Sequence, residues 1–216
     1  MMTDTHTHLY SDAFQEDRSQ MMQRAFDQGI DRFFIPAIDS SYTEAMYALE
    51  KEYPSVIFLM MGLHPTSVKE NYLEELAHVE EQFEKRRFYA VGEIGIDLYW
   101  DTSTLEIQKI AFKRQIQLAK KYKLPIVIHC RDAFDEIFEV LENEKGDDLF
   151  GIFHCFTGTY EQAQKAISYN MKLGIGGVVT FKNGKIDTFL SQIPLKQIVL
   201  ETDSPYLAPA PFRGKR

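Results

Sequence analysis

Short apolar segments alternate with longer polar stretches along most of the chain, and this alternation is the strongest structural signal in the sequence. Eight of the apolar segments have the length and character of strands that are buried on both faces. They cover residues 2–9, 32–38, 56–64, 89–97, 125–130, 150–156, 172–180 and 198–204. The intervening stretches are long and polar enough to form helices that cover these strands.

The expected helices occupy the intervals between the strands, with Gly29 and Gly146 as stop signals. The six clearest cover residues 12–28, 42–53, 72–87, 105–122, 133–144 and 160–169, and a weaker one covers 183–191. Strict alternation of buried strands and helices is typical of a parallel α/β sheet, and eight strands are the number that closes a barrel. We therefore predict an α/β fold of the TIM-type (β/α)8 barrel class.

The C-terminal end departs from this pattern. Only a short segment follows the eighth expected strand, and it ends in the basic stretch Arg213-Gly214-Lys215-Arg216. We therefore expect a barrel that lacks its final C-terminal helix. Truncation of the chain is the favoured interpretation, because a bare strand would expose a large apolar patch. The alternative is that something else covers this face.

Length and composition limit the domain and partner classes. A chain of 216 residues with 44% hydrophobic content can bury one large core, so we expect residues 1–216 to form a single domain. The 24 basic and 32 acidic residues give a net charge of −8. This charge disfavours partners recruited by the overall field, such as bulk nucleic acid or an anionic membrane, but it leaves room for a local basic patch.

The sequence predicts a cytoplasmic protein. No leader peptide is recognisable before the first strand, and no apolar run approaches the roughly 18 residues that span a bilayer. The two cysteines, Cys130 and Cys155, are too few for a disulfide framework, which fits a reducing compartment. We expect no membrane partner, and the sequence gives no sign of an obligate protein partner.

Metal-competent side chains stand at the ends of five expected strands. His6 and His8 are two residues apart in the first strand, so both lie on one face of the extended chain. Alone, this pair fits two hydrogen-bonded structural histidines better than a metal site. Repetition changes the balance, because four further strands end in Glu93, His129, His154 and Asp203.

Three of these groups have a Val or Ile two positions earlier, namely Val91, Val127 and Ile152. This spacing is expected when apolar side chains fill the barrel interior and polar side chains lie above them at the rim. The carboxyl ends of parallel strands meet at one rim, so we expect the six polar groups to converge there.

Four histidines and two carboxylates exceed the needs of one tetrahedral ion, but they suit two divalent ions about 3.5–4 Å apart that share a carboxylate. We assign Glu93 to the bridge, His6, His8 and Asp203 to the first ion, and His129 and His154 to the second. Such a pair lowers the pKa of a bound water, which becomes the nucleophile. Asp203 and Glu93 are the expected catalytic residues, with Asp203 orienting the water and taking its proton. Glu201, on the same face of the last strand, is expected to support a ligand from behind.

Further residues near the rim are candidates for substrate contact. His64 ends the third expected strand, and a substrate-contacting or proton-shuttling role competes with that of a packed structural imidazole. Arg131 follows His129 by two residues and is the best candidate for binding an anionic group. Tyr99 and Trp100 follow the fourth strand, where they could stack on a base or cap the barrel rim; the cap is slightly favoured.

Basic residues gather in the loops that follow the strands, despite the acidic total. They are Arg131, Lys182, Lys185, Arg213, Lys215 and Arg216. A positive collar around two cations suits an anionic substrate such as a phosphodiester. Ordinary solvated loop charge is the alternative, and it applies most to the lysines.

Several ordered motifs together resemble the TatD-related metal-dependent DNase family of the amidohydrolase superfamily. They are DTHTHL, GLHP, GEIGIDLYWD, LPIVIHCRDA, GIFHCFTGT, GIGGVVTFKN and ETDSPYLAPAPFRGKR, and they cover nearly the whole chain. At the matching positions, the family's metal ligands fall on His6, His8, Glu93, His129, His154 and Asp203. The resemblance implies a barrel hydrolase that acts on DNA, is Mg²⁺-dependent and digests from the 3′ end.

The ligand types suit two classes of divalent metal ion. Imidazole-rich sites favour Zn²⁺, Mn²⁺ or similar ions, whereas Mg²⁺ prefers oxygen ligands and water. We expect a transition metal in the purified protein and activity in an assay supplemented with Mg²⁺.

Three functional hypotheses follow from the sequence. The first is a phosphodiesterase of the nuclease kind that takes single-stranded DNA or its 3′ ends. The second keeps the site but changes the substrate to a small phosphoester, lactone or amide, since a fold alone does not settle function. The third is a metal-binding protein without catalysis.

Overall fold

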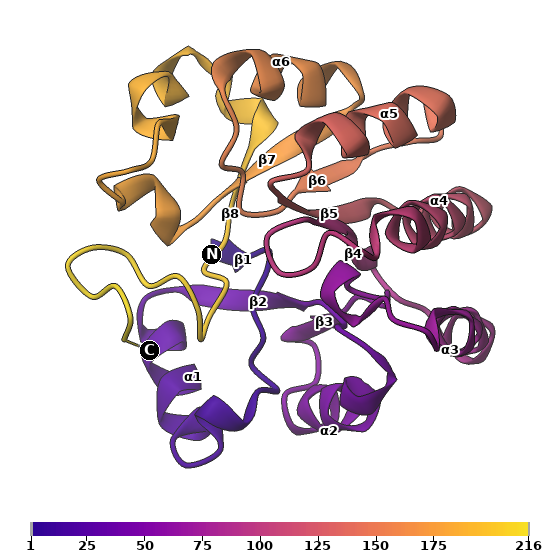
Figure 1. Cartoon of the computed structure of the whole chain (residues 1–216). Coiled ribbons are helices and arrows are strands. Elements are labelled where there is room, and N and C mark those ends of the chain that lie inside the picture. Colours follow the sequence, from indigo (N-terminus) through magenta and orange to yellow (C-terminus); the bar gives the residue numbers. More distant parts are fainter. Residues whose placement is uncertain (1, 216) are drawn as a thin grey trace.

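The computed structural model describes residues 2–215, in which parallel strands alternate with helices (Figure 1). The strands are β1 (Met2–Asp4), β2 (Ile30–Ile35), β3 (Ile57–Leu59), β4 (Val91–Asp97), β5 (Ile126–Arg131), β6 (Gly151–Phe153), β7 (Met171–Ile175) and β8 (Ile198–Leu200). The α-helices are α1 (Arg18–Asp27), α2 (Thr43–Glu52), α3 (Tyr72–Lys85), α4 (Leu105–Tyr122), α5 (Phe134–Glu144) and α6 (Tyr160–Ser168). These helices lie around the outside of the strands (Figure 1).

The strands form two parallel sheets, with the orders β1-β2-β3 and β4-β5-β6-β7-β8. Backbone contacts connect the sheets at both edges. A parallel bridge joins Met61 to Val91 between β3 and β4, and the Thr5 amide donates to the Leu200 carbonyl at 3.1 Å between the first and last strands. Alternating strands and helices with this sequential parallel order are consistent with the expected TIM-type barrel.

The structure differs from the sequence prediction mainly in the lengths of elements. Helix α4 has the expected bounds, but most strands stop several residues early because the chain leaves the sheet and turns over the rim. The prediction of a weak helix over 183–191 is wrong. The short 3₁₀ helices Ile186–Thr188 and Leu190–Gln192 form there instead. Within the described chain no α-helix follows β8.

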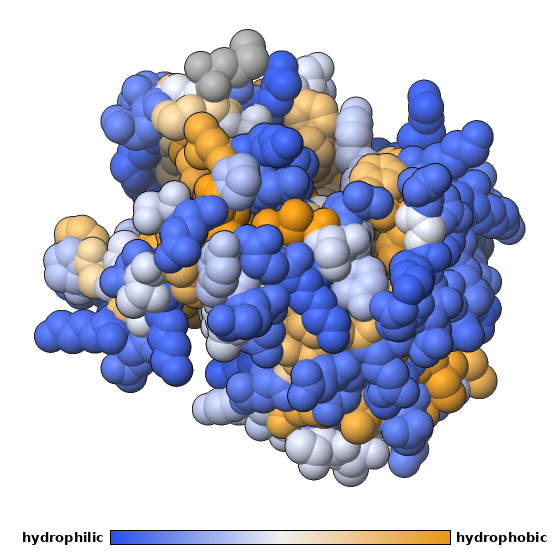
Figure 2. Space-filling view, turned by 90° about the horizontal axis from the view of Figure 1, so that it is seen from above, coloured by the Kyte–Doolittle hydropathy of each residue, from blue (hydrophilic) through white to orange (hydrophobic). Residues whose placement is uncertain are grey.

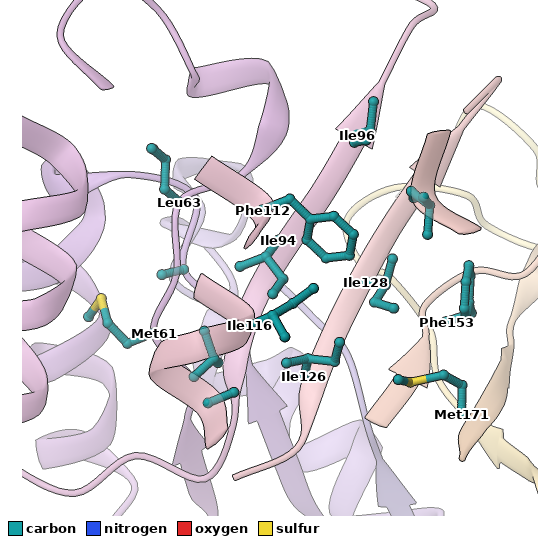
Figure 3. Packing of buried hydrophobic residues seen from close by; sticks show 14 of the residues in the cluster. Met61, Leu63, Ile94, Ile96, Phe112, Ile116, Ile126, Ile128, Phe153 and Met171 are labelled. Atoms are coloured by element: carbon teal, nitrogen blue, oxygen red, sulfur yellow. The ribbon is translucent and has the colours of Figure 1, made fainter. Parts of the chain in front are cut away.

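Buried apolar side chains form two clusters of different size. The larger lies between strands and helices, where Phe112 and Ile116 of α4 pack beside Ile94 and Ile128 (Figure 3). A small second cluster consists of Met60, Ala90 and Val127, with Phe34 packed against them. Because successive residues of a strand face opposite sides, Val127 and His129 share the face turned away from Ile126 and Ile128.

Val91, which we expected in the barrel interior, lies in the cluster between strands and helices. Val91 belongs to the larger cluster, whereas Val127 belongs to the small one. The pairing of β4 with β5 shifts register between Val91 and Ile94, so simple alternation does not hold across Gly92. A side chain at Gly92 would place its Cβ 2.7 Å from Cβ of Val127, which explains why the smallest residue occupies this close approach.

Two buried glutamines of α4 fix the main chain near the rim. Gln115 accepts from the Leu63 amide at 2.7 Å and donates to the Leu63 carbonyl at 3.2 Å. Gln108 accepts from the Asp97 amide at 2.8 Å and donates to the Asp97 carbonyl at 3.1 Å. The two glutamines are seven residues apart and therefore lie on one face of the helix. They position the residue before His64 and the last residue of β4.

The surface is mainly polar. Hydrophilic residues cover most of the face in Figure 2, and apolar residues emerge between them in patches. None of the helices formed by residues 2–215 combines the length and apolar character required to cross a bilayer.

Truncating a core residue of α4 tests the packing between this helix and the sheet. Phe112 is 0% exposed, so Phe112→Ala is expected to lower the free energy of unfolding by about 3–5 kcal/mol through lost burial and the cavity left behind. Ile110→Ala, at a position of the same helix that is 52% exposed, is the matched control and should cost far less. Urea denaturation of both variants measures the difference, and equal losses would contradict the packing described.

Candidate metal centre

The six expected ligands come from five strands and from the segments that follow these strands. Glu93 and His129 lie within β4 and β5, and His154 directly follows β6. His6, His8 and Asp203 lie in the segments just beyond β1 and β8. Backbone hydrogen bonds connect these two segments, because the Asp203 amide donates to the His6 carbonyl at 2.9 Å and the His8 amide donates to the Ser204 carbonyl at 2.7 Å. Residues from opposite ends of the sequence are thereby held together.

Glu93 lies at the centre of this group and is 2% exposed. Its Oε2 is 3.1 Å from Nε2 of His6 and 3.8 Å from Nε2 of His8. Its Oε1 is 2.8 Å from Nδ1 of His129, 3.3 Å from Nε2 of His64 and 3.9 Å from Nε2 of His154. One carboxylate thus has imidazoles on both sides, as a bridging ligand would.

Asp203 lies beside three of the imidazoles that also surround Glu93. Its Oδ1 lies 3.4 Å from Nε2 of His8, 3.6 Å from Nε2 of His154 and 3.8 Å from Nε2 of His6. The rings of His6 and His154 stack with centroids 3.4 Å apart. The structure therefore brings all six expected ligands into one cluster.

Within the cluster, ligand atoms lie close enough together to hold an ion in several ways. The groups whose ligand atoms lie within 4.8 Å of one another are His6–His8–Asp203, His6–Glu93–His154, His64–Glu93–His129 and His154–Cys155–Glu201. The first matches the set expected for one ion. None of these groups from the described residues contains both His129 and His154, which the sequence argument placed on the second ion.

The donor set fits divalent metal ions. Imidazole nitrogen and carboxylate oxygen are the ligands that Zn²⁺ and Mn²⁺ accept, and the carboxylates also suit Mg²⁺. Nε2 of His6 is buried and has no hydrogen-bond partner among residues 2–215, although a carboxylate oxygen of Glu93 is 3.1 Å away. A buried polar atom without a partner is costly, and a shared cation would satisfy both groups.

Mutual electrostatic interaction shifts the pKa values of the cluster. Burial by itself raises the pKa of Glu93, but the charges of His64, His6 and His154 outweigh burial and hold it well below its usual value. Burial likewise opposes the charged form of His154, yet Glu201, Glu93 and Asp203 raise its pKa to about 10.

The remaining histidines differ according to their neighbours. Burial, followed by the charge of His154, lowers the pKa of His6. Burial also lowers the pKa of His64. For His129, burial acts in the same direction, but hydrogen bonds with Asp97 and Glu93 raise the pKa above its usual value. Since metal ligands must be unprotonated, ions and protons compete for these nitrogens.

The other candidate residues lie around the cluster. Nε2 of His64 lies 3.2 Å from Nδ1 of His129, and Nδ1 of His64 forms a hydrogen bond with Thr66. His64 therefore contacts a proposed ligand directly. Glu201 is buried, lies 3.1 Å from Nδ1 of His154 and accepts from the Cys155 amide at 2.6 Å.

A cavity of about 690 Å³ opens over the cluster and is lined by several of its members. Arg131 is its only lysine or arginine among the described residues. Lys182, Lys185 and Lys215 of the expected positive collar do not line it, and Arg216 lies outside the described residues. Arg213 reaches its edge only indirectly, over the Phe181 ring at 4.6 Å.

Sequence reasoning missed several residues that hold the ligands. Asp97 Oδ2 lies 2.8 Å from Nε2 of His129, and the Tyr10 hydroxyl lies 2.8 Å from Nδ1 of His8. Asp4 accepts from the Thr202 hydroxyl at 2.6 Å, and burial raises its pKa to about 6. A signal for Asp97 was present, because it lies four residues after Glu93 in one strand and hence on the same face.

Comparisons with known proteins relate the whole chain to one family. The profile described as "TatD related DNase" matches residues 3–216. An uncharacterized metal-dependent hydrolase, YabD of Bacillus subtilis, is 39% identical over 100% of this chain and 85% of its own length. A protein named 3'-5' ssDNA/RNA exonuclease TatD, of Erwinia billingiae, is 31% identical over 99% of this chain and 83% of its own.

A solved structure resembles this one over nearly its full length. The crystal structure of the TatD homolog YJJV from Escherichia coli K12 has a TM-score of 0.92 and 30% sequence identity, and the match covers 99% of this chain and 83% of that one. An uncharacterized amidohydrolase from Saccharomyces cerevisiae has a TM-score of 0.82 at 19% identity, which supports the fold alone.

The contact between Asp97 and His129 generates a prediction for metal affinity. Asp97→Asn removes the charge that orients His129, and partners of this kind typically contribute about 10–100-fold to metal affinity. Calorimetric titration with Mn²⁺ is expected to show a loss of that size. Asp101→Asn, a nearby carboxylate that bonds Ser103 and Lys69 rather than the cluster, is the matched control and should bind Mn²⁺ like the unaltered protein. Equal affinity of all three proteins would refute the role of Asp97.

Proposed function

Because the chain belongs to the TatD-related DNase family of metal-dependent hydrolases, we propose that it is a deoxyribonuclease that removes nucleotides from the 3′ ends of single-stranded DNA. The family membership makes it an enzyme that hydrolyses ester bonds. The observation that carries the proposal is a cluster of four imidazoles and two carboxylates at the floor of a cavity that is also lined by Arg131.

The proposed ion ligands are His6, His8, Glu93, His129, His154 and Asp203, with Glu93 shared between two divalent ions. When bound, such ions lower the pKa of water and neutralise charge on a phosphodiester. Imidazole ligands favour Zn²⁺ or Mn²⁺ in the purified protein, and Mg²⁺ is expected to support activity in an assay.

Asp203 is proposed to orient the attacking water and to accept its proton. Burial alone raises the pKa of this carboxyl, but His154, His8 and His6 outweigh burial and lower it. Asp203 is therefore ionised at neutral pH and able to act as a base. Glu201 is proposed to orient His154, because its carboxylate contacts Nδ1 of that imidazole.

The cavity fits the end of a single strand better than the middle of a duplex. Its volume of about 690 Å³ lies in the range of small-ligand sites, so it accommodates a nucleotide or two rather than a double helix. Arg131 offers a planar, charged donor for a phosphate, and His64 lines the same cavity. A phosphate contact through Arg131 is compatible with the net charge of −8, since recognition is local.

The proposed location is the cytoplasm. Cys130 and Cys155 are both free thiols, which fits a reducing compartment.

Removing a ligand or the proposed base tests the function. His129→Ala and Asp203→Ala are each expected to lower the rate of hydrolysis of a 3′-labelled single-stranded oligodeoxynucleotide by about 10³-fold or more. The first substitution removes a proposed metal ligand, and the second removes both a ligand and the proposed base. His78→Ala is the control, since His78 bonds Thr43 outside the cluster and should not alter the rate.

Chelation provides a second arm of the same experiment. Removal of divalent ions should abolish cleavage, and added Mg²⁺ or Mn²⁺ should restore it. Undiminished cleavage by the metal-stripped protein would contradict the metal-dependent mechanism. Hydrolysis of small phosphoesters, lactones or amides, with none of any oligonucleotide, would move the substrate to the small-molecule class.

A further inference from the structure

Two exposed aromatic rings and one arginine form a group at the edge of the cavity. Tyr99 and Trp100 follow β4, and their ring centroids are 4.9 Å apart at an interplanar angle of 89°. The guanidinium carbon of Arg131, at the end of β5, lies 3.6 Å from the Tyr99 ring centroid and 5.5 Å from that of Trp100. We call these three residues the aromatic platform.

The platform is attached to the metal centre through one carboxylate. Oδ1 of Asp97 accepts from the Tyr99 amide at 3.0 Å and from the Trp100 amide at 3.2 Å. The other oxygen, Oδ2, lies 2.8 Å from Nε2 of His129. Asp97 is 2% exposed, and Gln108 holds its backbone on both sides. The backbone of Tyr99 and Trp100 is therefore fixed relative to a proposed ligand.

The rings do not serve the packing of the fold. Trp100 is 69% exposed and Tyr99 is 55% exposed, so neither caps the rim in the sense of closing it. Trp100 lines the cavity together with Arg131 and Glu93. A large exposed aromatic surface beside a cavity is characteristic of a ligand site, since a bound partner would bury that surface.

Arg131 completes the chemistry of the platform. No carboxylate in the part of the chain that the structure describes forms an ion pair with it, so its charge is available to a ligand. A guanidinium stacked on a ring keeps its in-plane N–H groups free to contact phosphate. An aromatic face and an unpaired guanidinium side by side match the two parts of a nucleotide, its base and its phosphate.

We propose that Trp100, supported by Tyr99 and Arg131, stacks on the nucleobase next to the phosphodiester that is held at the metal centre, while Arg131 contacts a phosphate of the same strand. This proposal rests on the proposed nuclease function and adds a base-binding subsite to it. Since every base has a π-face, the subsite recognises single-stranded nucleic acid without reading its sequence.

Trp100 is the only tryptophan of the chain, so its fluorescence reports on the subsite alone. The probe is a thymidine trimer with phosphorothioate linkages, which resist hydrolysis, added to the Mg²⁺-loaded enzyme. The trimer should quench the tryptophan emission in a saturable manner. An abasic trimer of the same charge should leave the emission unchanged, because no ring is present to stack.

Affinity provides a measurement that is independent of tryptophan emission. With a 5′-fluorescein-labelled trimer, anisotropy is expected to show about 5- to 150-fold weaker binding for Trp100→Ala, the range typical of one lost base stack. Trp100→Phe keeps a ring and should recover most of the affinity. Phe150→Ala is the control. Phe150 is a 40% exposed aromatic residue just before β6, at the end of that strand away from the cavity. The Phe150→Ala enzyme should bind the trimer like the unaltered enzyme.

The outcomes separate this subsite from the nuclease function. An enzyme that cleaves the ordinary thymidine oligonucleotide, yet binds the trimer equally well with Trp100 or with alanine, overturns the subsite and leaves the nuclease intact. Equal quenching by the abasic trimer also overturns it. If the unaltered enzyme neither binds nor cleaves any oligonucleotide, the nuclease proposal fails and the subsite fails with it.

Discussion

The interaction on which the site depends is the compensation of one buried charge. Glu93 is ionised and almost fully buried, a state that is unfavourable unless opposite charge or hydrogen-bond donors surround it. The surrounding groups are imidazoles from other parts of the sequence, so the cluster exists only where five strands come together. A cluster of this kind contributes little to stability by itself, and its composition is explained by the cations it suits.

The fold provides that meeting point by separating apolar and polar contacts. The larger apolar cluster packs helices against the outer face of the strands, and only a small cluster around Val127 lies on the other face. Packing between strands and helices therefore carries most of the burial. The inner face is left free for His129 and its neighbours at the rim. Gln108 and Gln115 extend this support by bonding the main chain where β4 ends and just before His64.

Asp97 connects two parts of the cavity that the sequence presents as unrelated. One oxygen bonds His129 in the cluster, and the other holds the backbone of Tyr99 and Trp100. One buried carboxylate thus connects the candidate metal centre to the backbone that carries the exposed rings. Such an arrangement suits the proposed substrate, in which a phosphodiester and a neighbouring base are placed in one geometry.

The sequence by itself determined the alternation of strands and helices, the bounds of α4, and the residue types that gather at the strand ends, because periodicity and side-chain chemistry are local properties. It did not determine the short strands, the missing helix over 183–191 or the register shift beside Gly92, which depend on where the chain leaves the sheet. The bonds of Asp97 and Tyr10 and the grouping of His129 with His64 also had to come from the structure. Residues on different strands acquire a distance only through register, loop path and packing, and these are decided by the whole chain at once.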